Sequence, residues 1–322
     1  MANSFLDGAR KLVLGTDNGI YVCDRKPRDA NSRPRKVLDC KNVSQVDVLE
    51  QHNIVLVLTE KTMYSYPMEA LDPDDVNSVV MKRGRKICHA NFFKSGVCAG
   101  TQLVCCVKTS GLSTTIKAYE PMDSMTKKAK KSGFAKMLAT NQDVLKPLKE
   151  FYIPTESSSI HFLRAKLCVG CARGFEIVSL DTLEAQSLLD QADTSLDFVQ
   201  RKENIKPIHI ERLGQEFLLC YTDYSFFVNR NGWRARPDWL ISWEGNPNAF
   251  AIFTPYILAF EPNFIEIRHM ETGALVHIIT NKNIRMLHSS SREVYTAKAT
   301  PPAEDMMLTC CVDSVRVRRR GR

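Results

Sequence analysis

EFLLCYTDYSFFVNRNGW, residues 216–233, contains two apolar runs that are separated by a short polar turn and followed by an Asn-Gly pair. Two such runs joined by turn residues are typical of a β-hairpin. We expect strands at 217–221 and 225–229 with a turn at 222–224, and Asn231-Gly232 predicts an exit turn. Because neither run alternates apolar with polar residues, both strands are expected to be covered on both faces.

The same pattern occurs six times along the chain. Each copy has a short apolar run, a turn containing Gly, Asp, Asn or Pro, and a second apolar or alternating run, and the copies begin at residues 12, 54, 103, 167, 217 and 257. A weaker seventh start, EVYTAK, follows at 293. Further strand candidates lie between the hairpins: QVDVL (45–49), ICHANFF (87–93) and IHIERL (208–213).

This spacing predicts the fold class. Steps of mostly 40 to 50 residues, with three or four strands in each, are typical of propeller blades. An α/β barrel is the main competitor, but it needs an amphipathic helix after each strand, and turns rich in Gly and Pro fill those positions instead. We therefore predict an all-β fold, a seven-bladed β-propeller with one helix-containing insertion between strands.

The propeller is expected to span residues 12–300, after a lead-in at 1–11 and before a basic C-terminal tail at 301–322. The insertion is placed at about 123–151, where one step is longer than its neighbours and Phe134, Met137, Leu138, Leu145 and Leu148 have helix-compatible spacing. A second helix-compatible segment lies at 183–202.

Composition narrows the class of protein. No apolar stretch is long enough to cross a membrane as a helix, and the N-terminus lacks the pattern of a secretory signal, so we expect a cytoplasmic, reducing environment. Eleven cysteines, most of them inside apolar runs, fit that environment. The net charge is +8, but five of the last seven residues are arginines, so the charge does not indicate nucleic-acid binding.

No motif for catalysis or metal binding was found. The sequence lacks nucleophile elbows, zinc-protease helices, phosphate-binding loops and dinucleotide fingerprints. Cys168-Val-Gly-Cys171 resembles half a zinc site, but on a strand these two side chains point to opposite faces, which favours a role in the core. His161 and His209 have no partner at ligand spacing. We predict no catalytic residues, no metal and no cofactor, and hence no enzymatic activity.

Two kinds of surface are candidates for binding. Trp233, Arg234, Arg236 and Trp239 lie in a segment, 231–247, that holds all three tryptophans, and Trp and Arg are enriched at interface hot spots. At least one of the tryptophans is expected to be core. Basic clusters at 25–36, at 82–86 and at Lys127, Lys128, Lys130 and Lys131 are either solvated loops or contacts to anionic lipid.

The residues also resemble a known family. The block KPIHIERLGQEFLLCYTDYSFFVNRNGWRARPDWLISWEGNPNAFAIFTPYILAFEPNFIEIRHMETGALVHII, 206–279, is similar to the second half of a citron homology domain. The similarity is greatest to the version at the C-terminal end of fungal Rho guanine-nucleotide exchange factors. LVLGTDNGIYV, 12–22, resembles the family's opening strand pair, and the resemblance covers about 12–300.

The resemblance implies a regulatory, protein-binding propeller with seven blades. Its implied partners are a Rho-type small GTPase and other domains of the host exchange factor, with peripheral contact at the plasma membrane or cell cortex as an alternative role. The family has no catalytic motif to carry over. The C-terminal sequence from 306 onwards departs from the family pattern, so an N-terminal segment is one candidate to complete the closing blade.

Overall fold

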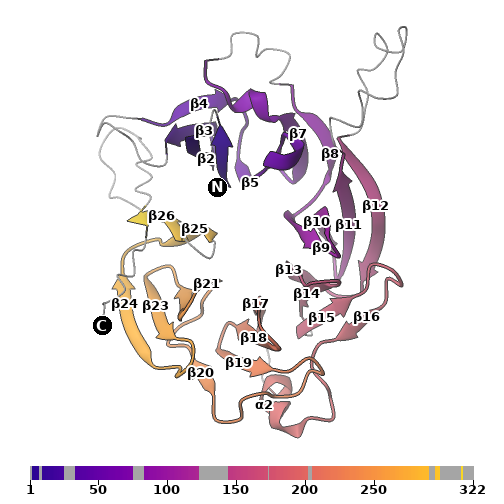
Figure 1. Ribbon diagram of the computed structural model, residues 1–322, viewed down its shortest axis with the longest axis vertical. Coiled ribbons are helices and arrows are strands. Elements are labelled where there is room, and N and C mark those ends of the chain that lie inside the picture. Colours follow the sequence, from indigo (N-terminus) through magenta and orange to yellow (C-terminus); the bar gives the residue numbers. More distant parts are fainter. Residues whose placement is uncertain are drawn as a thin grey trace. The chain divides into compact units, whose positions relative to one another are not determined.

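A computed structural model describes residues 2–6, 9–24, 33–74, 83–122, 144–172, 174–201, 205–289, 294–297 and 313–314. In these ranges the strands form seven antiparallel sheets, and within each sheet consecutive strands pair in chain order. Six sheets have four strands and one has three (Figure 1). The chain divides into two compact units, one made of residues 1–157, 164–166 and 180–183, and the other of 158–163, 167–179 and 184–322.

The first unit contains three four-stranded sheets. They consist of β1 (Ala2–Leu6), β2 (Ala9–Thr16), β3 (Gly19–Asp24) and β4 (Arg35–Leu38); β5 (Val43–Leu49), β6 (Ile54–Thr59), β7 (Thr62–Pro67) and β8 (Arg85–His89); and β9 (Phe92–Cys98), β10 (Thr101–Ser110), β11 (Ser113–Pro121) and β12 (Leu145–Ile153). Two short 3-10 helices, η1 (Glu50–His52) and η2 (Met68–Leu71), flank β6 and β7.

The second unit contains the remaining sheets. They consist of β13 (Ser157–Phe162), β14 (Leu167–Cys171), β15 (Gly174–Val178) and β16 (Ala185–Ser187); β17 (Pro207–Leu213), β18 (Glu216–Tyr221), β19 (Tyr224–Val228) and β20 (Leu240–Ser242); β21 (Ala249–Phe253), β22 (Tyr256–Phe260), β23 (Phe264–His269) and β24 (Leu275–Thr280); and β25 (Arg285–Ser289), β26 (Val294–Ala297) and β27 (Asp313–Ser314). The 3-10 helix η5 (Thr194–Leu196) and the short helix α2 (Asp197–Gln200) follow β16.

The six predicted hairpins are the middle strand pairs of the six four-stranded sheets. The hairpin at 216–233 is β18–β19, in which Phe217 pairs with Val228 and Cys220 with Ser225. All five residues of β19 are buried, as the absence of polar alternation predicted. The predicted all-β propeller class is confirmed, because successive four-stranded meanders are the repeating unit of that fold. The count of seven blades stays a prediction.

The apolar residues of adjacent sheets pack against each other within each unit. In the first unit, one cluster joins the β1–β4 and β5–β8 sheets and another joins the β5–β8 and β9–β12 sheets. In the second unit, a cluster around Tyr221 and Phe226 joins the β13–β16 and β17–β20 sheets, and one around Phe227 and Trp243 joins the β17–β20 and β21–β24 sheets. Burial of both faces of each middle strand explains its unbroken apolar sequence.

The helix-compatible reading of Leu145 and Leu148 was wrong. Both residues lie in β12, the outermost strand of its sheet, and Leu148 sits at a register shift next to Pro147. Proline lacks a backbone N–H, and an edge strand tolerates that loss because only one of its sides is paired. The rest of the predicted insertion, 123–143, including Phe134, Met137 and Leu138, lies outside the described residues.

The segment 183–202 is helical only near its end. It begins with β16, and a helical turn starts at Thr194, where the Asp193 carboxylate accepts a hydrogen bond from the backbone N–H of Ser195. Carboxylates at this position satisfy backbone N–H groups that have no partner within the helix. At the N-terminus, β1 pairs with β2 in the first sheet. In the predicted tail, β27 pairs with β26.

Candidate partner-binding surface

The turn after β19 holds Trp233 at the surface in a fixed orientation. The side-chain oxygen Oδ1 of Asn229 accepts hydrogen bonds from the backbone N–H groups of Asn231 (2.8 Å) and Trp233 (3.2 Å). Gly232 has φ of +82°, and a Cβ there would lie 2.1 Å from the backbone oxygen of Leu188. Glycine is therefore required both by the backbone conformation and by the close contact. This explains why glycine occupies the second position of the Asn-Gly pair.

The Trp233 side chain is anchored at its nitrogen and open on its ring. Its Nε1–H donates to Oδ2 of Asp190 at 3.0 Å, and the backbone N–H of Asp190 donates to the oxygen of Gly232 at 3.2 Å. The residue nevertheless keeps 43% of its surface exposed. An exposed indole that is already ordered loses little conformational freedom when a partner covers it, and this favours binding.

Arg234 is committed to contacts within the domain. Its backbone N–H donates to Oδ2 of Asp193 at 2.7 Å, and its guanidinium carbon lies 5.1 Å from the centre of the Phe198 ring. Hydrogen bonds from the Ser195 side chain and from the Arg234 backbone hold the pKa of Asp193 below its ordinary value. Arg234 thus fastens the Trp233 turn to the segment that carries η5 and α2.

Arg236 and Trp239 also have structural contacts. Arg236 donates to Oε2 of Glu216 (2.7 Å from Nη2) and to Oε2 of Glu271 (3.1 Å from Nη1). Trp239 is only 8% exposed, and its ring meets that of Phe227 edge-on with 4.6 Å between centroids. Of the four predicted binding residues, Trp233 is therefore the one that presents a free aromatic face. The other three hold the segment in place.

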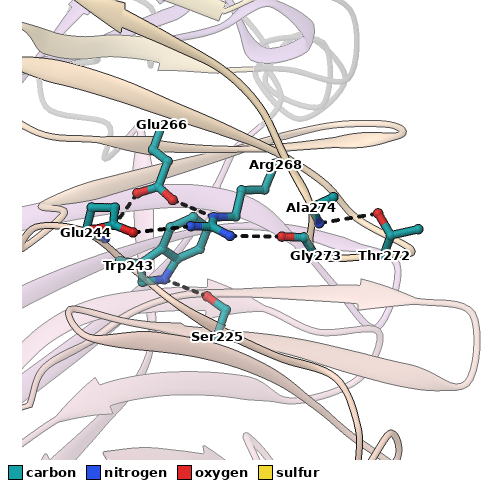
Figure 2. A network of polar contacts seen from close by, with 8 residues as sticks. All are labelled: Ser225, Trp243, Glu244, Glu266, Arg268, Thr272, Gly273 and Ala274. Carbon is teal, nitrogen blue, oxygen red and sulfur yellow. Dashed lines mark hydrogen bonds and ion pairs between the residues drawn. The ribbon is translucent and has the colours of Figure 1, made fainter.

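Trp243 is part of a polar network beneath the surface. Its Nε1–H donates to Oγ of Ser225 at 3.1 Å, and the Arg268 guanidinium lies 5.9 Å from its ring (Figure 2). Arg268 also bonds to the buried Glu266, whose second oxygen accepts the backbone N–H of Glu244 at 3.2 Å. Trp243 is thus core, in agreement with the expectation that at least one tryptophan would be.

The structure places only some of the predicted basic residues. Lys127, Lys128, Lys130 and Lys131 lie outside the described ranges, as do residues 25–32. The described parts of the other clusters, Arg33 to Lys36 and Arg83 to Lys86, run into the first residues of β4 and β8. Arg35 forms an exposed ion pair with Asp74 at 2.7 Å, and Lys36 pairs with Asp39.

Sequence spacing missed one histidine pair. The rings of His161 and His209 meet edge-on with centroids 5.3 Å apart, and Nε2 of His209 lies 3.2 Å from Oε2 of Glu211. Among the residues that the structure describes, no group of three or more His, Cys, Asp or Glu side chains is arranged to hold a metal ion. Cys168 and Cys171 are both buried in β14, and burial raises the pKa of Cys168.

Comparison with known proteins identifies the family. The model of the CNH domain matches residues 8–290. The chain is 54% identical over 287 residues to Rho1 guanine nucleotide exchange factor 1 of Schizosaccharomyces pombe, covering 87% of this chain and 21% of the relative. It is 38% identical over 300 residues to RHO1 GDP-GTP exchange protein 2 of Saccharomyces cerevisiae, covering 89% of this chain and 22% of the relative. The chain thus spans about a fifth of the length of these curated relatives.

A solved structure agrees with the sequence comparison. The structure titled AfRom2 CNH domain superposes with a TM-score of 0.82 at 62% identity, covering 92% of this chain and 90% of that one. None of the helices in the described ranges is long and apolar enough to span a membrane. The resemblance drawn from the 206–279 block is confirmed: the chain belongs to the CNH domain family.

Proposed function

We propose that this CNH domain is a non-catalytic regulatory module of a Rho guanine-nucleotide exchange factor. The relatives at 54% and 38% identity are named as Rho1 exchange proteins, but the chain spans only about a fifth of the length of each. Exchange itself is therefore assigned to other parts of such a host protein. The domain regulates or localises the host in the cytoplasm or, peripherally, at the plasma membrane or cell cortex.

The proposed partner is a Rho-type small GTPase, and the proposed contact is the Trp233 surface. The observation that supports this contact is the exposed indole anchored to Asp190. Interface hot spots are enriched in Trp, and a ring already fixed in its bound orientation adds to affinity. Three neighbouring residues hold this segment in place. Arg234 contacts Phe198, Arg236 bonds to Glu216, and Trp239 packs against Phe227.

Titration calorimetry tests the partner directly. The domain is titrated with a Rho-type GTPase loaded with either GDP or a non-hydrolysable GTP analogue. We expect saturable binding to the GTPase in at least one nucleotide state. A difference in affinity between the two states would show that the domain distinguishes them. Absence of binding to both states, by a domain whose circular dichroism shows folded β structure, would refute the GTPase proposal.

A second candidate function, membrane targeting, is supported by the placement of basic residues. In all three sheets of the first unit, exposed basic side chains lie where the chain enters the outermost strand: Arg33 and Lys36 at β4, Arg83 and Lys86 at β8, and Lys146 and Lys149 at β12. Anionic lipid headgroups would attract positive charge at these equivalent positions of the three sheets. Other domains of the host factor are further partners compatible with this surface.

A further inference from the structure

A cluster of sulfur and phenol groups joins two sheets of the first unit. Cys88 of β8 pairs across the sheet with Met63 of β7, and Cys106 of β10 places its thiol 3.5 Å from the Met63 sulfur. Met63, Cys106 and Tyr119 belong to one buried cluster, and the partly buried Cys88 packs against it. Two thiols from adjacent sheets thus lie in one cluster around Met63.

The surroundings of Cys88 favour its thiolate. The interaction with Cys106 lowers the pKa of Cys88 below its ordinary value, against the opposing effect of burial, and Tyr119 and the nearby charge of Lys117 add to the lowering. Lys117 lies at the solvent boundary, where it pairs with Glu150 at 3.2 Å, and Cys88 itself is only half-buried. Reactive cysteines occupy partly exposed, electropositive sites of this kind, whereas thiols buried among apolar groups are inert.

The neighbouring cysteines lack these features. Burial raises the pKa of Cys105 to about 12. Cys105 is adjacent to Cys106 on β10, so its side chain points to the opposite face of the sheet and away from Cys88. The interaction with Cys88 and burial raise the pKa of Cys106.

We propose that Cys88 and Cys106 form a peroxide-sensitive dithiol that closes into a disulfide between β8 and β10. The Cys88 thiolate attacks one oxygen of hydrogen peroxide, the O–O bond breaks, and the departing hydroxide takes up a proton to become water. Cys88 is then a sulfenic acid. The Cys106 sulfur attacks the Cys88 sulfur, the S–S bond forms, and the S–O bond breaks as oxygen leaves with the Cys106 proton as a second water. The two thiols lose two electrons in total, and one peroxide is reduced to two waters.

The site is a modification site and does not depend on the GTPase proposal. A covalent link between the β5–β8 and β9–β12 sheets would couple the redox state of the surroundings to the rigidity of this unit. The link is reversible, because a disulfide is reduced again by an excess of small thiols.

Peptide mapping tests the link without any variant. The folded domain is treated with hydrogen peroxide, free thiols are blocked by alkylation, and trypsin then yields Cys88 in residues 87–94 and Cys106 in residues 95–108. We expect the two peptides to be joined, the intact chain to lose two free thiols and about 2 Da, and dithiothreitol to reverse both changes. Recovery of Cys88 fully alkylated after peroxide would overturn the proposal.

Three variants identify the second sulfur, because residues 95–108 also contain Cys98 and Cys105. Cys88→Ser should abolish the linked peptide and leave Cys106 reduced. Cys106→Ser should leave Cys88 as a sulfenic acid that dimedone traps. Cys105→Ser, the matched control, should keep the link. A linked peptide that persists in Cys106→Ser, or one that is lost in Cys105→Ser, would overturn the pairing.

Discussion

The guanidinium carbon of Arg236 lies 4.0 Å from the centre of the Phe227 ring, so the arginine covers an aromatic side chain of the core while its nitrogens bond to carboxylates. Glu216 on β18 and Glu271 in the turn before β24 are the two acceptors. Arg236 thereby ties its own segment to two adjacent sheets. Arg236, which the sequence suggested as a binding residue, therefore makes contacts that stabilise the domain.

Replacing Arg236 should therefore reduce stability. For Arg236→Ala we expect the free energy of unfolding to fall by about 1–2 kcal/mol, since a stacked cation contributes about 1 kcal/mol and half-exposed ion pairs contribute less each. Arg236→Lys should recover only part of this, because an ammonium cannot bond both carboxylates while lying flat on the ring. Urea denaturation followed by tryptophan fluorescence measures both. Unchanged stability together with lost GTPase binding would instead make Arg236 a contact residue.

Trp233→Ala should weaken GTPase binding by at least about tenfold, the loss typical of an interface hot spot. Stability should fall by no more than about 1 kcal/mol, because the ring is exposed and only the hydrogen bond to Asp190 is lost. Calorimetry and urea denaturation measure the two quantities. Tyr152→Ala is the matched control, because it removes an aromatic ring that is 61% exposed in the other unit. Equal losses of affinity in the two variants would exclude the Trp233 surface as the contact.

The strands that the sequence predicted well are those packed on both faces. The runs at 54–59 and 217–221 are unbroken because adjacent sheets cover them, and they became β6 and part of β18. Outer strands carry a weaker pattern. In β12 five consecutive residues are exposed, and the remaining apolar residues matched a helical spacing by chance. ICHANFF, read as one strand, divides into the ends of β8 and β9, which belong to different sheets.

The candidate surface was only partly predictable. Composition pointed to the segment with Trp233, but its anchors, Asp190 and Asp193, lie about 40 residues earlier in the chain, in the connection between β16 and η5. No local sequence pattern indicates which of the three tryptophans are buried and which is exposed. That depends on partners such as Ser225 and Phe227, which only the packing of strands brings near Trp243 and Trp239.

The buried hydrogen bond between Trp243 and Ser225 offers a direct test of the core. Ser225→Ala should lower the free energy of unfolding by about 1–3 kcal/mol, because it leaves the indole N–H buried without an acceptor. Trp243→Phe combined with Ser225→Ala should cost less than the sum of the two single changes, since both polar groups are then removed. A double-mutant cycle in urea measures the coupling. Strict additivity would show that the bond contributes nothing.

Glu261 should make stability depend on pH. Burial, with a smaller contribution from Glu266, raises the pKa of Glu261 above its ordinary value in the folded state. Its Oε1 is buried without a hydrogen-bond partner among the described residues. The folded protein then binds more protons than the unfolded chain between the two pKa values, so this group's contribution is fully present at acid pH and is lost as pH rises through the folded value.

Glu261→Gln should consequently be more stable than the wild type at neutral pH, and the difference should shrink as the pH falls through the raised folded-state pKa toward the ordinary glutamate pKa. Urea denaturation of both proteins from pH 4 to pH 8 measures the trend. Glu211→Gln, at a carboxylate for which the neighbouring His209 is a partner, is the control and should not show this gain. A constant difference across the range would contradict the assignment to Glu261.

Membrane targeting makes a separate prediction about charge. Reversal of Lys127, Lys128, Lys130 and Lys131 to Glu should reduce sedimentation with liposomes that contain phosphatidylserine by at least about tenfold, since each basic residue near an anionic surface contributes about 1 kcal/mol. Binding of the wild type should also weaken strongly as salt rises from about 0.1 M to 0.5 M, because the Debye length shrinks.

The matched control reverses four exposed basic residues of the second unit: Arg201, Lys206, Lys282 and Arg285. If both variants lose binding equally, the attraction follows net charge and the lysine cluster is not a lipid site. If the wild type binds in a salt-insensitive manner or does not bind, the domain does not target anionic membranes by charge.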